Sequence, residues 1–239
     1  MHINNYKCFR DRVRMVLAMD HNGRAGNFFF LSIFDQHEEI LTCPWLHYVH
    51  SYAITGLGEG KTDSKTAHAY WTQESYFRLI YNDINEQAQA QIIKFGGDPS
   101  ATIDRSEVRR VFDNLISTTE EVLPEDLIIA SYYAYAIGVG RDVEQIKYIL
   151  VSDAISLRTE SWSQGFSGRV VDYVIRTYRD PIVVQLIRDP RAALASSNHQ
   201  WVNSLGNMYG IHWGNYWNRL KRLMKLDFDF DSVFSFGCW

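Results

Sequence analysis

The chain has 239 residues, of which 46% are hydrophobic and 22% charged, a size that suits one domain with a sizeable core. Its formal charge of −4 and pI near 6.1 give no indication of a general nucleic-acid-binding or anionic-membrane surface. The three cysteines (Cys8, Cys43 and Cys238) are scattered along the chain and are expected to be reduced thiols. No signal peptide is recognised, and the apolar stretch at 127–139 is too short to cross a bilayer. These features predict a cytoplasmic protein.

Short apolar runs predict strands near residues 13–19, 39–43, 147–152 and 182–188. Helices are expected over residues 26–36, 69–95, 104–122, 125–138, 165–178, 190–205 and 212–225. This alternation, without an internal repeat, predicts a single α/β domain over 1–239 with a central parallel sheet flanked by helices. The largely helical stretch 69–145 is expected to interrupt the sheet as an insertion, in the role of a lid or a substrate wall.

Local signals place some of these boundaries. Asp104 with Glu107 three residues later predicts a capped helix start, and the run from Lys94 to Pro99 predicts a helix stop. The run from Gly56 to Lys61 has the spacing GxGxxK, which also occurs in phosphate cradles. No strand precedes it, so a flexible loop in solvent is the favoured interpretation.

The first predicted strand runs directly into a glycine-containing turn and then a helix. The turn reads DHNGRAGN from Asp20 to Asn27, with Arg24 inside it. A strand, a turn and a helix in this order present backbone N–H groups and a positive helix end to an anion. The nucleotide P-loop pattern GxxxxGK[ST] is absent, and a plain tight turn is the alternative.

The last predicted strand ends in Arg188, which is followed by Asp189 and Pro190 and, eight residues after the arginine, by Ser196. Pro190 suits the first turn of a helix, so Arg188 is expected at the carboxyl end of a buried parallel strand, where open α/β sheets bind ligands. A guanidinium and a hydroxyl that converge there suit a phosphate. A buried pair of Arg188 and Asp189 is the alternative.

Three segments, GRAGNFFF from Gly23, LSIFDQH from Leu31 and RDPRAALAS from Arg188, resemble the sulfotransferases that use 3′-phosphoadenosine 5′-phosphosulfate (PAPS). The resemblance implies a P-loop-like α/β fold, PAPS as the donor and adenosine 3′,5′-bisphosphate (PAP) as the product. It implies that Arg188 and Ser196 hold the 3′-phosphate and that the 5′-phosphosulfate lies on a loop made of Gly23, Arg24, Ala25, Gly26, Asn27 and Phe28. Family members often have two small hydroxylated residues where this chain has Asn27, which can still donate, and Phe28, which cannot.

The resemblance also implies the chemistry. Sulfuryl transfer is an in-line displacement, for which positioning and cationic stabilisation of the leaving phosphate are the main demands. Arg24 is expected to supply that stabilisation, and no metal is required. A general base must take the acceptor's proton: His47 and His50, after the second strand, are the first candidates, and Asp153 is the carboxylate alternative. His21 is expected either to contact the phosphosulfate or to pack beneath it.

The expected acceptor is the hydroxyl or amine of a small molecule, with no nucleic acid or membrane as partner. The middle of the chain is rich in aromatic residues that suit a flat or cationic molecule or, alternatively, ordinary helix packing: Trp45, Tyr48, Trp71, Tyr76, Phe77, Tyr132, Tyr133 and Tyr135. More loosely, the chain resembles bacterial natural-product sulfotransferases such as those of saxitoxin-type alkaloids. The basic, glycine-rich end segment of many members is absent, so the nucleotide is expected either to be more exposed or to be held by stacking on Trp201 or Trp217.

Two other functions compete. One is a small-molecule kinase on a related fold, which the missing Lys-Ser/Thr pair disfavours and which magnesium-dependent ATP turnover would reveal. The other is a degenerate relative that binds a nucleotide or a partner without catalysis, which Phe28 in the loop favours.

Overall fold

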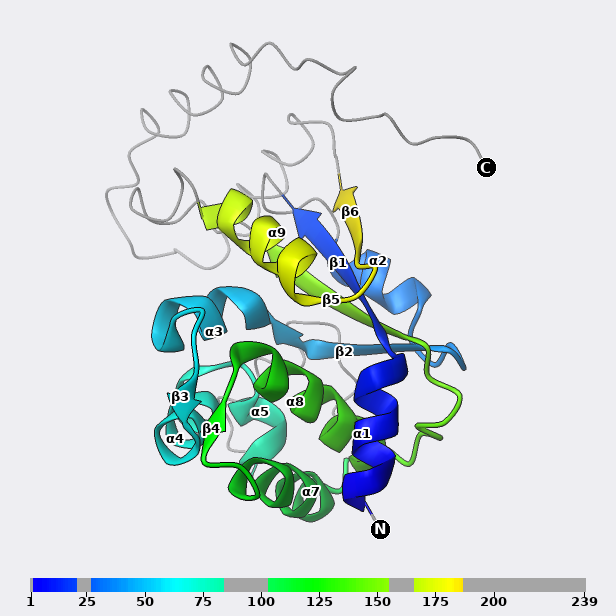
Figure 1. Ribbon diagram of the computed structural model, residues 1–239. Coiled ribbons are helices and arrows are strands. Elements are labelled where there is room, and N and C mark those ends of the chain that lie inside the picture. The colour runs from blue at the N-terminus through cyan, green and yellow to red at the C-terminus, as the bar shows by residue number, and fades with distance from the viewer. Residues whose placement is uncertain (1, 21–26, 84–102, 155–165, 187–239) are drawn as a thin grey trace, which may run out of the picture. The chain divides into compact units, whose positions relative to one another are not determined.

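The structure is a computed structural model, and it describes residues 2–20, 27–83, 103–154 and 166–186 (Figure 1). Contacts divide the chain into two compact units, residues 1–188 and 189–239, and all the described residues belong to the first. The predicted helices at 190–205 and 212–225 and the predicted stop at 94–99 lie outside the described residues.

The described core is built on a four-stranded sheet in the order β2 (Ile40–His47), β5 (Tyr148–Ala154), β1 (Arg14–Asp20) and β6 (Ile182–Leu186). Every neighbouring pair is parallel, so the predicted α/β class with a parallel central sheet is confirmed. The four strands fall where the apolar runs predict them. β2 runs longer than expected, to His47, past an irregularity in its pairing with β5 between Thr42 and His47.

Side chains that alternate along the strands pack on two different layers. In β1, Met15, Leu17 and Met19 belong to the main core, whereas Ala18 joins Leu31 and Leu150 in a smaller cluster on the other face. Because successive strand residues point to opposite faces, burial on both faces explains why these strands are nearly continuous apolar runs.

Three helices adjoin these faces. α2 (Asn27–Ile33) supplies the smaller cluster, whereas α1 (His2–Arg12) and α9 (Phe166–Thr177) pack into the main core (Figure 1). α1 was not predicted, since its sequence is mostly polar. Tertiary contacts hold it: Phe9 is fully buried, and Arg12 donates to the carbonyl oxygens of Val143 and Ile146 at 2.7 and 3.2 Å.

The chain between β2 and β5 forms the predicted insertion, which begins earlier than residue 69, directly after β2. Its described elements are α3 (Val49–Leu57), β3 (Thr62–Asp63), α4 (Ser64–Glu74), α5 (Arg78–Tyr81), α7 (Arg105–Ser117), β4 (Glu121–Val122) and α8 (Pro124–Gly138). β3 and β4 pair antiparallel as a small second sheet. Figure 1 shows α4, α5, α7 and α8 gathered on the side of β2 that faces away from β1.

The predicted helix over 69–95 is wrong in its described part, because α4 ends at Glu74 and α5 covers only Arg78–Tyr81. Ser75 causes the break. Its hydroxyl donates to the Trp71 carbonyl at 2.6 Å and accepts the Phe77 N–H at 3.1 Å, so it replaces a helical hydrogen bond with a turn.

The predicted cap at Asp104 is confirmed: its carboxylate accepts the Glu107 N–H at 3.0 Å and α7 begins at Arg105. That helix ends at Ser117 and not at 122, because Glu121 and Val122 pair with β3.

The predicted loop is shorter than expected, because α3 includes Gly56 and Leu57, and its residues 58–61 are exposed or half-buried. Gly58 has φ 81°, a left-handed conformation that glycine adopts without strain. Glu59 then accepts from Arg169 at 2.6 Å and Arg176 at 2.9 Å. The two guanidinium groups lower the pKa of the Glu59 carboxyl. The loop therefore fastens α9 to the insertion.

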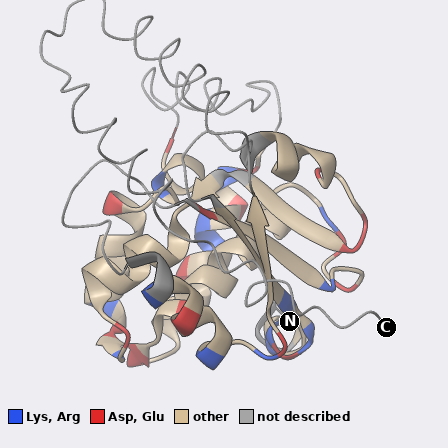
Figure 2. Ribbon diagram, turned by 90° about the horizontal axis from the view of Figure 1, so that it is seen from above, with Lys and Arg blue, Asp and Glu red and all other residues tan. Residues whose placement is uncertain are grey.

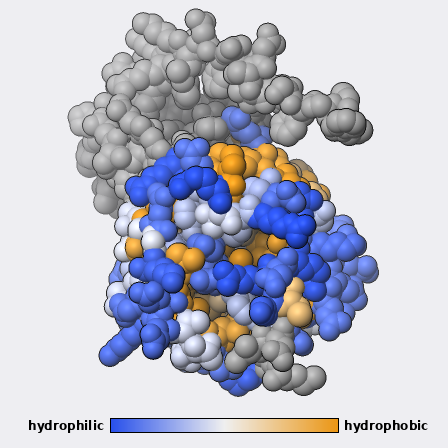
Figure 3. Space-filling view, viewed as in Figure 1, coloured by the Kyte–Doolittle hydropathy of each residue, from blue (hydrophilic) through white to orange (hydrophobic). Residues whose placement is uncertain are grey.

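β6 departs from the prediction that Arg188 follows a buried strand. Its residues are half-buried, and Ile182 is exposed. Among the described strands β6 pairs with β1 alone, and Figure 3 shows apolar side chains gathered on the surface over this strand. Figure 2 shows acidic and basic residues interspersed around a sheet whose strands are mostly uncharged.

A glycine substitution tests the packing of α7 on α8. A Cβ on Gly138 would lie 2.4 Å from Val108 Cγ2 and 3.1 Å from the Asp104 carbonyl oxygen, so we expect Gly138→Ala to lower the free energy of unfolding by about 1–3 kcal/mol. A Cβ on Gly60 would meet nothing within 4 Å, and Gly60→Ala should change it by less than about 0.5 kcal/mol. Equal denaturation midpoints for both variants would contradict this packing.

Candidate functional site

The carboxyl ends of the four strands lie at one edge of the sheet, because all four run parallel. Asp20 at the end of β1 is in register with Ala154 of β5 and with Leu186 of β6, and His47 at the end of β2 is in register with Ser152. In open α/β sheets ligands bind outside this edge. It is therefore the candidate site.

Most of the residues predicted to bind the donor lie outside the described residues. These are His21, Gly23, Arg24, Ala25, Gly26, Arg188 and Ser196. Asn27 and Phe28 begin α2, as predicted. Arg24 follows Asp20 by four residues in the sequence, and Arg188 follows Leu186 by two. Both predicted anion-binding segments thus continue from neighbouring, paired strands.

Two of the three candidates for the general base form one buried pair. The Asp153 carboxylate accepts the backbone N–H of His50 at 2.9 Å and lies 3.1 Å from its Nδ1. The other carboxylate oxygen accepts the Ser51 hydroxyl at 2.6 Å. His50 is 0% and Asp153 1% exposed. Asp153 belongs to the main-core face of β5, two residues after Val151, and so points toward α3.

These contacts make Asp153 the cap of α3. The N-cap residue of that helix, Tyr48, makes no side-chain hydrogen bond to the first turn, whereas a Ser, Thr, Asp or Asn is usual there. The carboxylate from β5 satisfies the orphan N–H of His50 instead and places a negative charge at the positive end of the helix. Asp153 thus joins the insertion to the sheet.

The other ring nitrogen of His50 faces Tyr178, the residue directly after α9. His50 Nε2 lies 3.3 Å from the Tyr178 hydroxyl, and burial, reinforced by nearby carboxylates that include Glu125 and Asp153, raises the pKa of Tyr178. A protonated Tyr178 donates to Nε2, so the proton of a neutral His50 is on Nδ1, directed at Asp153.

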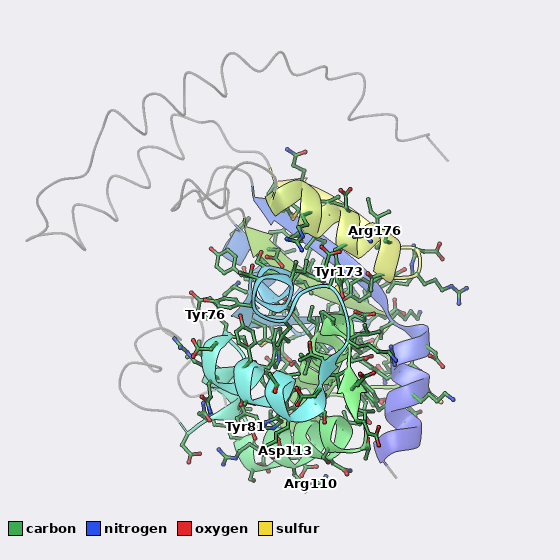
Figure 4. The ribbon with its side chains drawn as sticks, turned by 60° about the vertical axis from the view of Figure 1, so that its left-hand side comes forward. Tyr76, Tyr81, Arg110, Asp113, Tyr173 and Arg176 are labelled. Carbon is green, nitrogen blue, oxygen red and sulfur yellow. The ribbon has the colours of Figure 1, made fainter. Side chains whose placement is uncertain are left out.

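A second tyrosine secures the same helix. Tyr173 donates to the Glu125 carboxylate on α8, and burial and that carboxylate raise its pKa. Tyr173 and Arg176 both lie on α9 (Figure 4), where Arg176 reaches Glu59. The helix that covers His50 is therefore held at three points, through Tyr178, Tyr173 and the Glu59 pair.

The third candidate, His47, is buried at the end of β2 among aromatic rings. Its ring centroid lies 6.2 Å from that of Tyr48 and 6.1 Å from that of Tyr76. Tyr76 also lies 6.0 Å from Tyr48 and 5.7 Å from Tyr52. We call the set His47, Tyr48, Tyr52 and Tyr76 the aromatic corner; Figure 4 shows Tyr76 beside α3.

Most of the other aromatic residues proposed for a ligand wall are core residues. Trp71, Phe77, Tyr132 and Tyr133 are fully buried and Tyr135 is nearly so. Trp71 Nε1 donates to the Ser131 hydroxyl at 2.7 Å, and Tyr133 packs edge-on against Phe9. The packing alternative therefore holds for these five, whereas Tyr48 and Tyr76 remain half-buried beside the sheet edge.

The site combines a buried polar network with an aromatic corner. In this geometry His50 cannot receive a proton from an acceptor, because both of its ring nitrogens face protein groups in the interior. Ser51 and Tyr178 were not found from the sequence. They lie 102 and 128 residues from their partners Asp153 and His50, and no local spacing signals such contacts.

Within the described ranges, no three His, Cys, Asp or Glu side chains gather as a metal site requires, and none of the helices there is long and apolar enough to cross a membrane. No protein-family model, no curated protein and no solved structure matches the chain.

Replacing Asp153 tests the network. Asp153→Ala leaves two N–H groups of His50 and the Ser51 hydroxyl without their buried acceptor, so we expect the free energy of unfolding to fall by about 3 kcal/mol or more. Asp113 is the matched control. Like Asp153, it accepts from a histidine ring and a hydroxyl group, those of His68 at 2.7 Å and Tyr81 at 2.8 Å. These contacts lie on the half-exposed surface of the insertion (Figure 4).

Asp113→Ala should therefore lower that free energy by about 1 kcal/mol or less. Urea denaturation measures both variants. Similar losses for the two would show that Asp153 does not anchor α3.

Proposed function

We propose that the protein is a sulfotransferase, with the P-loop-like fold of that family, which moves a sulfuryl group from PAPS to a hydroxyl or amine of a small molecule. The observation that carries the proposal is the adjacency of β1 and β6, whose ends Asp20 and Leu186 are in register. The two segments that resemble PAPS-binding motifs continue from these ends. A donor with a 5′-phosphosulfate and a 3′-phosphate needs two anion-binding segments close together.

In this proposal Arg24 and the backbone N–H groups at the start of α2 bind the 5′-phosphosulfate, and Arg188 and Ser196 bind the 3′-phosphate. The acceptor oxygen or nitrogen attacks sulfur, and the bond from sulfur to the bridging 5′-phosphate oxygen breaks. Negative charge then grows on that phosphate, where a guanidinium and N–H donors stabilise it. PAP leaves with both phosphates.

The acceptor's proton goes to a base, and we assign this role to His47. Its ring lies at the end of β2, one strand away from β5 and two from β1. His50 and Asp153 are hydrogen-bonded to each other in the interior, so we assign them to holding α3 and not to proton transfer.

A relative that binds the nucleotide without turnover is the second candidate. The saturation of His50 by Asp153 and Tyr178 favours it, because it removes one histidine from the set of available bases. This candidate shares the nucleotide site with the first and differs from it in giving no sulfated product.

Nucleotide binding tests both candidates. We expect PAP to raise the unfolding temperature of the full chain, since a ligand that binds only the folded state adds about 2.7 kcal/mol at a hundredfold excess over its Kd. ADP and ATP should have a smaller effect. Arg188→Ala should weaken PAP binding by about 1.5–3 kcal/mol, measured by calorimetry. Arg179→Ala, which removes one exposed arginine, is the control for net charge.

No thermal shift with PAP, or a preference for ATP with magnesium, would refute the sulfonucleotide site. Equal PAP affinity in Arg188→Ala and Arg179→Ala would remove Arg188 from it.

Turnover tests the role of Arg24. With sulfur-labelled PAPS and a panel of phenols, alcohols and amines, we expect Arg24→Ala to lower kcat about a hundredfold or more, as when a donor to a developing oxyanion is removed. PAP affinity should change less than kcat. A rate equal to that of the unmodified protein would exclude Arg24 from the mechanism, and PAP binding without product from any acceptor would favour the second candidate.

A further inference from the structure

Tyr48 has a strained backbone at the candidate site. Its φ is 54° and its ψ 29°, the left-handed region that is unfavourable for residues with a Cβ. Among the described residues, Gln36 and Asp180 are the other non-glycine residues with positive φ, and both are exposed turn residues. Tyr48 is instead half-buried at the carboxyl end of β2.

The surrounding hydrogen bonds hold this conformation. The Tyr48 N–H donates to the Ser152 carbonyl at 3.0 Å and its own carbonyl accepts the Tyr52 N–H at 2.8 Å. Two residues later, Asp153 holds the His50 N–H. The β2–α3 turn is thus fixed to β5 on both sides of Tyr48, and strain that is held in this way is typical of functional sites.

Tyrosine is a poor choice for this position by local criteria. A glycine or asparagine would adopt the left-handed conformation at less cost, and an asparagine, aspartate or serine would cap α3. Tyr48 caps nothing with its side chain. What it supplies is a ring, which lies 6.0 Å from Tyr76 at an interplanar angle of 39° and 6.2 Å from His47.

We propose that Tyr48 is a substrate-positioning residue, whose ring forms the wall on which a planar aromatic acceptor stacks beside His47. Asp153 and Ser152 hold the strained turn that aims the ring. The identity of the stacked molecule as an acceptor rests on the proposed function. The choice of a planar ring follows from the aromatic corner itself, because offset or edge-on contacts with Tyr48 and Tyr76 favour a flat partner.

The test uses 2-naphthol as a planar probe and 2-decalol as a non-planar probe of similar size, with the full chain and calorimetric or NMR detection. Tyr48→Phe keeps the ring, Tyr48→Leu keeps apolar bulk without it, and Tyr48→Gly and Tyr48→Ala remove the side chain. We expect 2-naphthol to bind at least fivefold more tightly than 2-decalol. Tyr48→Phe should bind it within twofold of the unmodified protein, and Leu, Gly and Ala should weaken it at least fivefold.

Thermal unfolding of the same variants tests the strain separately. Tyr48→Gly should unfold a few degrees above Tyr48→Ala, because glycine alone adopts positive φ freely. Absence of 2-naphthol binding, equal affinity for the two probes, or unchanged binding in Tyr48→Leu would overturn the proposal. So would loss of folding in Tyr48→Leu, since the ring would then be a packing requirement.

PAP binding in the same samples separates this inference from the proposed function. PAP binding without 2-naphthol binding would overturn the role of Tyr48 and leave the sulfonucleotide site. Selective 2-naphthol binding without PAP binding would support the stacking wall and refute the sulfotransferase.

Discussion

The Asp153 carboxylate is the interaction on which the arrangement of the candidate site depends. A buried carboxylate is tolerated only when donors surround it, and here His50 and Ser51, on the first turn of α3, supply them. The same contacts cap α3 and place His50 against Tyr178 of the segment that follows α9. One charge on β5 thus fixes the sheet, the start of the insertion and the helix that covers it relative to one another.

This anchoring separates two roles, holding the structure and transferring a proton, that could not be told apart from the sequence. His50 and Asp153 are suitable types of residue for proton transfer, yet they are satisfied by each other and by Tyr178 inside the protein. A group whose hydrogen bonds are all made to its own chain stabilises structure and has little capacity left for a ligand. The aromatic corner, in contrast, combines half-buried tyrosine rings with a strained turn beside the sheet edge. In the proposed function, anchoring and ligand contact therefore fall to neighbouring residues.

The sheet could be predicted from the sequence because parallel strands buried on both faces are continuous apolar runs. α7 could be predicted from Asp104, a cap that lies next to its helix in sequence. α3 could not, because its cap is Asp153, 103 residues from His50, and the end of α4 could not, because a single serine hydroxyl makes it. The same distinction between local and long-range contacts applies to the candidate site. Individual residues were identifiable from their chemistry and their place after a strand, whereas their pairing depends on tertiary contacts.

The charges at the carboxyl edge of the sheet explain why the adjacency of β1 and β6 matters for the proposed function. The residues that end the four strands or directly follow β2 are an aspartate, a histidine, a tyrosine and uncharged side chains; no lysine or arginine is among them. In the proposed function, the cations that bind the donor come from the segments that continue from β1 and β6, where Arg24 and Arg188 stand in the sequence. Because these strands are paired in register, the segments that contain the two arginines begin at neighbouring points of the sheet edge, although 164 residues separate Arg24 from Arg188 in the sequence. A nucleotide with two phosphate groups would contact both arginines across that edge, whereas a ligand with a single phosphate would need only one of them.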